Sequence, residues 1–163
     1  MNSQKIIEKP PLFPAIFSAP LKILPLKYHS KILVKFLNRL LKEQLDEGEL
    51  DFLEHKTLCV TVSDAGISYY ISLSNNTLVA KSPNSRKDIY LQACIYDYIQ
   101  LIARKQDPDT LVFQRRLVMQ GNTELGLELK NFLDGLDLES NRNFSKIESL
   151  LEKSLPIYQR IFR

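Results

Sequence analysis

The sequence has 163 residues, 44% of them hydrophobic and 25% charged, with a formal net charge of +3. These values predict one globular domain with a real core and exclude a disordered chain. No apolar run approaches the ~20 residues of a transmembrane helix, and two cysteines, Cys59 and Cys94, make no disulfide framework, so we expect buried thiols in a cytoplasmic protein.

The N-terminal quarter is basic and rich in proline. Residues 1–42 hold eight Lys and Arg against one acid, Glu8, and five of the eight prolines lie in residues 1–25. The charge predicts either a solvated helix face or an anionic partner, membrane or nucleic acid. The prolines forbid one long helix. We expect the apolar segment 1–27 to pack on the domain or to contact an apolar partner.

A helical period predicts a helix from about Tyr28 to Gln44, and Gly48 is a residue type that stops a helix. Its apolar face carries Leu33, Phe36, Leu37, Leu40 and Leu41, and its basic face carries Lys31, Lys35, Arg39 and Lys42.

A period of two then predicts strands. The expected strands cover residues 57–63, 67–73, 77–82 and 88–93, with a hairpin turn at Asn75-Asn76. A helix over 96–105 should stop at Asp107-Pro108, before a short helix with Asp109 as a possible N-cap. The last expected strand is 116–120.

Beyond Gly121, Asn122 or Thr123 should cap a helix whose apolar stripe is Leu125, Leu129, Phe132, Leu133 and Leu136. A further helix is expected within residues 138–163, as an extension of the central domain 28–137. Because the strands come mostly in one block, the order predicts an α+β fold. We expect a mainly antiparallel sheet of about five strands, covered on one face by helices.

Signals for catalysis are weak. Neither histidine has a neighbour at ligand spacing, so we expect no metal. Asp107 and Asp109 read as turn and cap residues, although a small enzyme using Asp107, Asp109 or Arg116 stays open. As neighbours in a strand, Arg115 and Arg116 should point to opposite faces, and one should pair with an acid such as Glu124. No aromatic-basic strand signature supports nucleic acid.

A surplus of apolar helix surface remains around one modest sheet. It predicts either a dense core or an apolar tunnel that would hold a lipid tail. The candidate lining residues are Leu33, Phe36, Leu37, Leu40, Val60, Val62, Tyr69, Ile71, Ile102, Phe113, Leu117, Met119, Leu125, Leu129, Phe132 and Leu133. Phe113, Leu117 and Met119 are expected to face this interior.

The run Asp107-Pro108, Phe113, Leu117-Val118-Met119, Gly121-Asn122 and Leu125 resembles the sterol-carrier-protein-type-two fold family. Residues 103–131, 24–54 and 17–22 resemble one bacterial branch, the accessory factors of oxygen-independent ubiquinone biosynthesis. The resemblance covers roughly residues 12–136. Wider members usually have Gly-Lys at Arg115-Arg116, and Asn122 replaces the branch's usual Asp.

The resemblance implies a non-catalytic lipid carrier with no cofactor other than bound lipid. It would hold the polyprenyl tail of ubiquinone intermediates, or a phospholipid, and present the head group to biosynthetic enzymes, including iron-sulfur hydroxylases of peptidase-like fold. Arg115 and Arg116 would contact head group or partner. Lys31, Lys35, Arg39 and Lys42 would meet an anionic membrane transiently, which makes the protein cytoplasmic or peripheral at the inner membrane. The alternative is an assembly scaffold with a packed core and no ligand.

Overall fold

The computed structural model describes residues 11, 25–136, 153, 156–158 and 160, so most of segments 1–27 and 138–163 lies outside the described residues. The elements, in chain order, are α2 (Leu26–Leu40), α3 (Lys42–Asp46), the 3-10 helix η1 (Asp51–Leu53), β1 (Leu58–Val62), β2 (Ile67–Ser74), β3 (Thr77–Ala80), β4 (Ile89–Ala93), α4 (Ile95–Ile102), α5 (Pro108–Phe113), β5 (Val118–Gly121) and α6 (Thr123–Gly135). The helix expected over residues 28–44 is two helices, which meet at Leu41.

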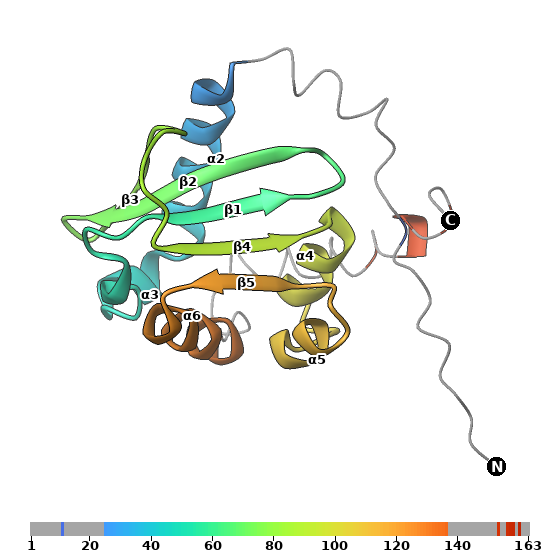
Figure 1. Ribbon diagram of the computed structural model, residues 1–163. Helices are drawn as coiled ribbons and strands as arrows, with labels where there is room; N and C mark the ends of the chain where they lie inside the picture. Colours follow the sequence, from blue (N-terminus) through green and yellow to red (C-terminus); the bar gives the residue numbers. More distant parts are fainter. Residues whose placement is uncertain (1–10, 12–24, 137–152, 154–155, 159, 161–163) are drawn as a thin grey trace.

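The five strands form one sheet in the order β3-β2-β1-β4-β5. Three of its four pairings are antiparallel, and β1 pairs with β4 in parallel. The parallel pair arises because the chain leaves β3 at one edge and re-enters beside β1 (Figure 1). The expected α+β fold with a mainly antiparallel sheet is confirmed.

One face of the sheet carries the core. Leu58, Ile71 and Ile89 lie side by side in register, and Leu73 lies opposite Leu78. All five are buried in the main hydrophobic cluster together with side chains of α2, α5 and α6. The helices therefore cover this face, and α2 lies behind the sheet in Figure 1. On the opposite face, Lys87 from the β3–β4 connection lies 5.4 Å from the ring centre of Tyr90.

A side chain of α2 blocks part of the sheet edge at β3. Asn38 Nδ2 donates to the carbonyl of Leu78 at 2.8 Å, and the Leu78 N–H donates to Asn38 Oδ1, also at 2.8 Å. Both outward-facing backbone groups of Leu78 are thus satisfied, as an edge strand requires if it is not to pair with another chain.

Turn and cap residues set the remaining geometry. Asn75 and Asn76 have φ of 51° and 56°, as in a tight hairpin turn, which confirms the expected turn. Asp107, rather than Asp109, is the N-cap of α5, because its side chain accepts the Thr110 N–H. Asn122 caps α6 by accepting the Leu125 N–H, as expected.

Gly121 turns the chain from β5 into that cap at φ +121°. A Cβ at this position would lie within 2.4 Å of the Asp88 carbonyl oxygen, so only glycine fits between β5 and the start of β4.

Candidate functional site

A set of apolar side chains on the helix-covered face of the sheet packs against the core without being fully buried. They come from the helices α2, η1, α4 and α6 and from the strands β1, β2 and β5, and η1 lies beside α6, with the ring centres of Phe52 and Phe132 6.5 Å apart. The set comprises Leu33, Leu37, Phe52, Val60, Tyr69, Tyr98, Leu101, Ile102, Met119, Phe132, Leu133 and Leu136. We call this set the half-buried apolar face. Such a surface needs a cover, which a hydrocarbon chain can provide.

A cavity of about 200 Å³ opens at the α4–α6 end of the half-buried apolar face. Leu101 and Ile102 of α4 and Leu133 of α6 form its apolar wall. Its rim is polar and carries charges of both signs, with Arg104 and Asp107 among them. An apolar floor below a mixed polar rim suits an amphiphile whose tail enters and whose head stays at the surface.

The candidate lining residues separate into three groups. Leu40, Ile71, Leu117, Leu125 and Leu129 are buried and fill the core. Leu33, Leu37, Val60, Val62, Tyr69, Ile102, Met119, Phe132 and Leu133 are half-buried. Phe36 and Phe113 are exposed.

The prediction that Phe113 faces the apolar interior is wrong. Phe113 is 89% exposed, whereas Leu111 on the same helix is fully buried. Two positions along a helix correspond to a rotation of about 200°, so α5 cannot bury both side chains. Phe36 is 47% exposed for the same reason, because α2 turns Val34 toward the core.

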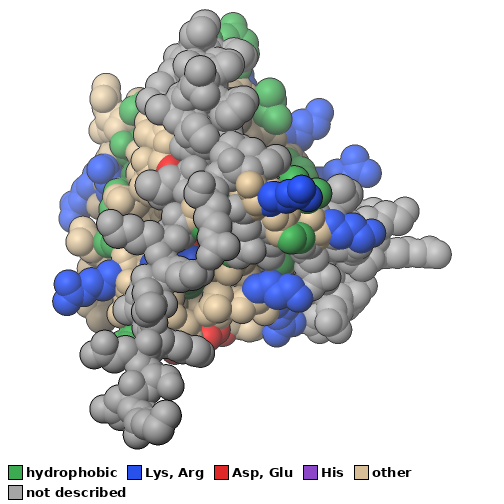
Figure 2. Space-filling view, turned by 90° about the vertical axis from the view of Figure 1, so that its right-hand side faces the viewer, with side chains coloured by type: hydrophobic (Ala, Val, Ile, Leu, Met, Phe, Trp, Pro, Cys, Tyr) green, Lys and Arg blue, Asp and Glu red, His purple; other side chains and the backbone are tan. Residues whose placement is uncertain are grey.

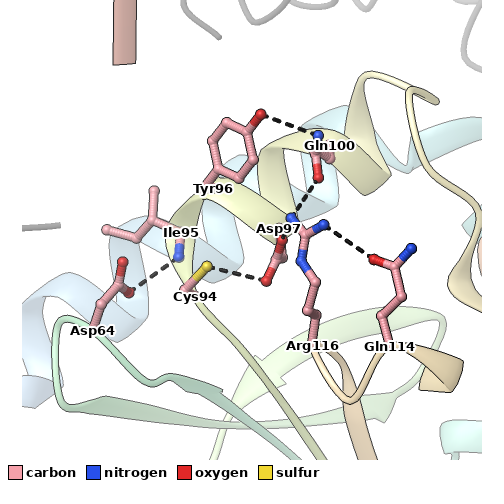
Figure 3. Close-up of polar contacts among 8 residues, drawn as sticks. All are labelled: Asp64, Cys94, Ile95, Tyr96, Asp97, Gln100, Gln114 and Arg116. Carbon is pink, nitrogen blue, oxygen red and sulfur yellow. Dashed lines mark hydrogen bonds and ion pairs between the residues drawn. The ribbon is translucent and has the colours of Figure 1, made fainter. Parts of the chain in front are cut away.

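Arg116 belongs to a buried polar cluster between α4 and the turn before β5 (Figure 3). Its guanidinium forms an ion pair with Asp97, whose side chain is 1% exposed. It also donates to Gln100 Oε1 at 2.9 Å and to Gln114 Oε1 at 3.2 Å. The cluster ties α4 to the start of β5.

This arrangement corrects two expectations. Arg116 pairs with Asp97 rather than with an acid such as Glu124. The two arginines are also not strand neighbours, because β5 begins at Val118 and Arg115 lies in the preceding turn with φ of 59°. Arg115 is exposed, whereas Arg116 is held inside the cluster. The role of either arginine toward a head group or partner stays a prediction.

Cys94 extends the same cluster. Its thiol donates to Asp97 Oδ2 at 3.1 Å. Burial raises the pKa of Cys94 to about 12, with smaller contributions from Asp97. A thiol with this pKa stays protonated at neutral pH and is a poor nucleophile.

The acids that could have suggested catalysis have structural partners. Asp107 accepts hydrogen bonds from the Thr110 hydroxyl at 2.6 Å and from the Thr110 N–H, and these bonds lower the pKa of Asp107. Asp109 forms an ion pair with Lys130 at 2.9 Å. Within the described residues, no three His, Cys, Asp or Glu side chains are grouped as a metal would need.

Asp97 is the residue of this cluster that the sequence analysis missed. It is the single acid in the apolar stretch Ile95–Ile102, on the side of α4 that also carries Leu101. An acid inside such an apolar stretch needs a partner when it is buried. The sequence could therefore have indicated that Asp97 pairs with a cation.

Helix α2 presents a second surface feature. Tyr28, Ile32 and Phe36, spaced four residues apart, are 60%, 67% and 47% exposed. Lys31, Lys35 and Arg39 are exposed on the same helix, which has no acid in its first turn, and Lys42 follows at the start of α3. On the face shown in Figure 2, Lys and Arg side chains are prominent, with hydrophobic side chains beside them. None of the described helices is long and apolar enough to cross a membrane.

A five-stranded sheet covered on one face by helices defines an α+β domain, and comparison with known proteins shows its family. The chain belongs to the SCP-2 sterol transfer family, whose model matches residues 35–134. More particularly, it is 42% identical over 128 residues to the ubiquinone biosynthesis accessory factor UbiT of Escherichia coli (strain K12), covering 78% of this chain and 73% of that protein. The factor of the same name from Escherichia coli O157:H7 gives the same figures.

Solved structures show the same fold. The ubiquinone synthesis protein UbiJ-SCP2 matches with a TM-score of 0.55 at 19% identity, over 68% of this chain and 97% of that one. The resemblance drawn from residues 103–131 is thus confirmed at the level of family and fold.

Proposed function

We propose that this protein is a non-catalytic lipid-binding accessory factor of oxygen-independent ubiquinone biosynthesis. It holds the polyprenyl tail of ubiquinone intermediates, or a phospholipid, and presents the head group to the pathway's enzymes, including iron-sulfur hydroxylases of peptidase-like fold. The relation to UbiT supports the pathway, and the half-buried apolar face supports the ligand class.

The half-buried apolar face is the single observation that carries this proposal. Each CH₂ removed from water contributes ~0.8 kcal/mol, so a prenyl tail gains far more from such a surface than a small polar substrate would. The cavity beside Leu133 and Leu136 gives the tail an entrance at the protein surface. Its polar rim would leave the head group within reach of an enzyme.

The same physics requires contact with a membrane. A long tail is as stable in a bilayer as in a protein cavity, so transfer through water would be slow and loading should take place at the bilayer surface. Lys31, Lys35 and Arg39 would attract an anionic leaflet at about 1 kcal/mol per charge. Lys42 would contribute less, because it pairs with Asp46 at 3.0 Å. Tyr28 and Ile32, exposed on the same helix, would enter the headgroup region.

Lipid bound to the purified chain tests the proposal. Organic extraction followed by mass spectrometry should recover prenylated quinone precursors or phospholipid. Leu133→Trp adds bulk to the cavity wall and should lower the lipid recovered per protein severalfold. Asn131→Trp adds the same bulk on the exposed side of α6 and should leave the yield unchanged.

A chain that carries no lipid and binds no prenylated quinone would contradict the proposal and favour an assembly scaffold. The amount of ubiquinone made by cells that carry variants of this protein tests whether it is an enzyme. Substitution of Asp107 or Asp109 by Ala should preserve output, because neither is assigned a chemical step, and loss of output in a variant that still folds and binds lipid would favour an enzyme.

Vesicle binding tests the membrane step. Lys31→Glu with Lys35→Glu should weaken binding to vesicles containing phosphatidylglycerol by at least tenfold, from the loss of about 1 kcal/mol per charge. Lys56→Glu with Lys87→Glu makes the same charge change outside α2, since Lys87 lies over Tyr90 on the opposite face of the sheet, and should have a much smaller effect. Equal effects of the two pairs would show that net charge, rather than α2, governs binding.

A further inference from the structure

The surface formed by α5, β5 and α6 carries features that lipid binding does not use. A groove of about 370 Å³ runs between the two helices. Val112 of α5 and Leu127 of α6 line it and are 44% and 57% exposed. Phe113 stands next to Val112 and is 89% exposed, the most exposed of the large hydrophobic side chains described. We call this surface the α5–α6 face.

Strand β5 forms the floor of the groove and is an edge of the sheet. The Asn122 N–H donates to the Asp88 carbonyl just before β4. Every second residue before it, Gln120 and Val118, therefore also directs its backbone groups toward β4. By the alternation of an antiparallel pair, Met119 and Gly121 direct their N–H and C=O groups away from β4. Both residues line the groove. Unlike the β3 edge, this edge has no side chain bonded to it among the described residues.

Two opposite charges flank β5, so a twofold rotation would bring the positive charge of one copy near the negative charge of the other. Arg115 precedes the first residue of β5 by three positions, and Glu124 follows the last residue by three. Both are exposed and form no ion pair within the described part of the chain. If two copies meet with their β5 strands antiparallel, Arg115 at one end of the strand in each copy comes to the same end of the contact as Glu124 of the other.

We propose that the α5–α6 face binds a second copy of this chain and makes a twofold-symmetric dimer. Phe113 of each copy enters the groove of the other, against Val112 and Leu127, and Arg115 pairs with Glu124 across the interface. A protruding side chain next to a matching groove on one surface is what a twofold interface requires, since the same patch serves both copies. The proposal is independent of which lipid the protein carries.

Sedimentation velocity over a concentration series tests this proposal. The unmodified chain should shift from monomer to dimer at micromolar concentrations, because the patch is small for an interface. Phe113→Ser should raise the dissociation constant at least about tenfold. Because the Phe113 side chain is exposed, this substitution should not affect folding. Ile32→Ser removes a comparably exposed side chain from α2 and should leave the dissociation constant unchanged.

A charge exchange makes the test specific to the proposed geometry. Arg115→Glu should weaken the dimer by placing two acids side by side, and the double variant Arg115→Glu with Glu124→Arg should restore it to near the original affinity. A chain that stays monomeric up to about 300 µM, a regime that includes very weak complexes, would overturn the proposal and leave the face for a different protein. A dimer that survives Phe113→Ser, or that the double variant fails to restore, would also overturn it.

Discussion

Replacement of Arg116 by Met should be among the most destabilising single changes in this protein. The substitution keeps an apolar stem of similar length but removes the cation that faces Asp97. The Asp97 side chain is 1% exposed, and the other described group bonded to it is the thiol of Cys94, a weak donor. Breaking a buried ion pair from one side typically costs about 3–5 kcal/mol.

The size of the effect follows from what remains after the change. Arg116 also donates to Gln100 and Gln114, whose oxygens would lose a partner. We therefore expect a loss of about 3–5 kcal/mol in the free energy of unfolding, which corresponds to a fall of roughly 10 °C in melting temperature for a domain of this size. Urea denaturation followed by circular dichroism measures it.

Two further variants identify the cause. Asp97→Leu together with Arg116→Met removes both charges and should recover most of the lost stability, because an apolar pair has no desolvation cost. Arg86→Met, on an exposed connection, should change the free energy of unfolding by no more than about 0.5 kcal/mol. A loss below about 1 kcal/mol for Arg116→Met, or a double variant no more stable than the single one, would refute the assignment of a buried ion pair.

Three other predictions follow from local contacts. Asn38→Ala should lower the free energy of unfolding by about 1–3 kcal/mol, since it removes two 2.8 Å bonds to Leu78, and urea denaturation beside an Asn131→Ala control checks this. Asp107→Ala should lower the melting temperature at pH 7. Because the cap lowers the pKa of Asp107 below 3.8, that difference should persist above this pH and vanish as the pH falls through the folded-state value; unequal melting temperatures in strong acid would contradict it. Cys59 and Cys94 should resist Ellman's reagent at pH 8 until urea is added, because both are buried and the pKa of Cys94 is about 12; rapid reaction of either thiol in the native chain would contradict this.

Local patterns predicted the elements well where neighbours in sequence determine the structure. The alternation in residues 57–63 and 67–73 and the Asn75-Asn76 turn specify a hairpin without reference to the rest of the chain. The parallel pairing of β1 with β4 could not be predicted in this way, because it depends on a connection from β3 that passes β2 and β1.

The site was less predictable because burial depends on packing between distant segments. Leu117 and Phe113 are equally apolar in sequence, yet one is 1% and the other 89% exposed. Helix α5 turns Leu111 toward the core and therefore leaves Phe113 outside, whereas Leu117, beyond the helix, is packed into the core. The partner of Arg116 lies 19 residues earlier, on helix α4, so no spacing rule points to Asp97.

The amide of Asn38 also limits how this sheet can grow. With both outward groups of Leu78 occupied, the short β3 edge is a poor template for another strand, and a further strand would pair more readily beside β5. A twofold contact at β5 would bring the two open edges together and leave a partly blocked edge at each end of the joined sheet. Growth beyond two chains would then be disfavoured, whereas a second fully open edge would allow continuous fibres. One asparagine on a helix thus disfavours polymerisation along the sheet.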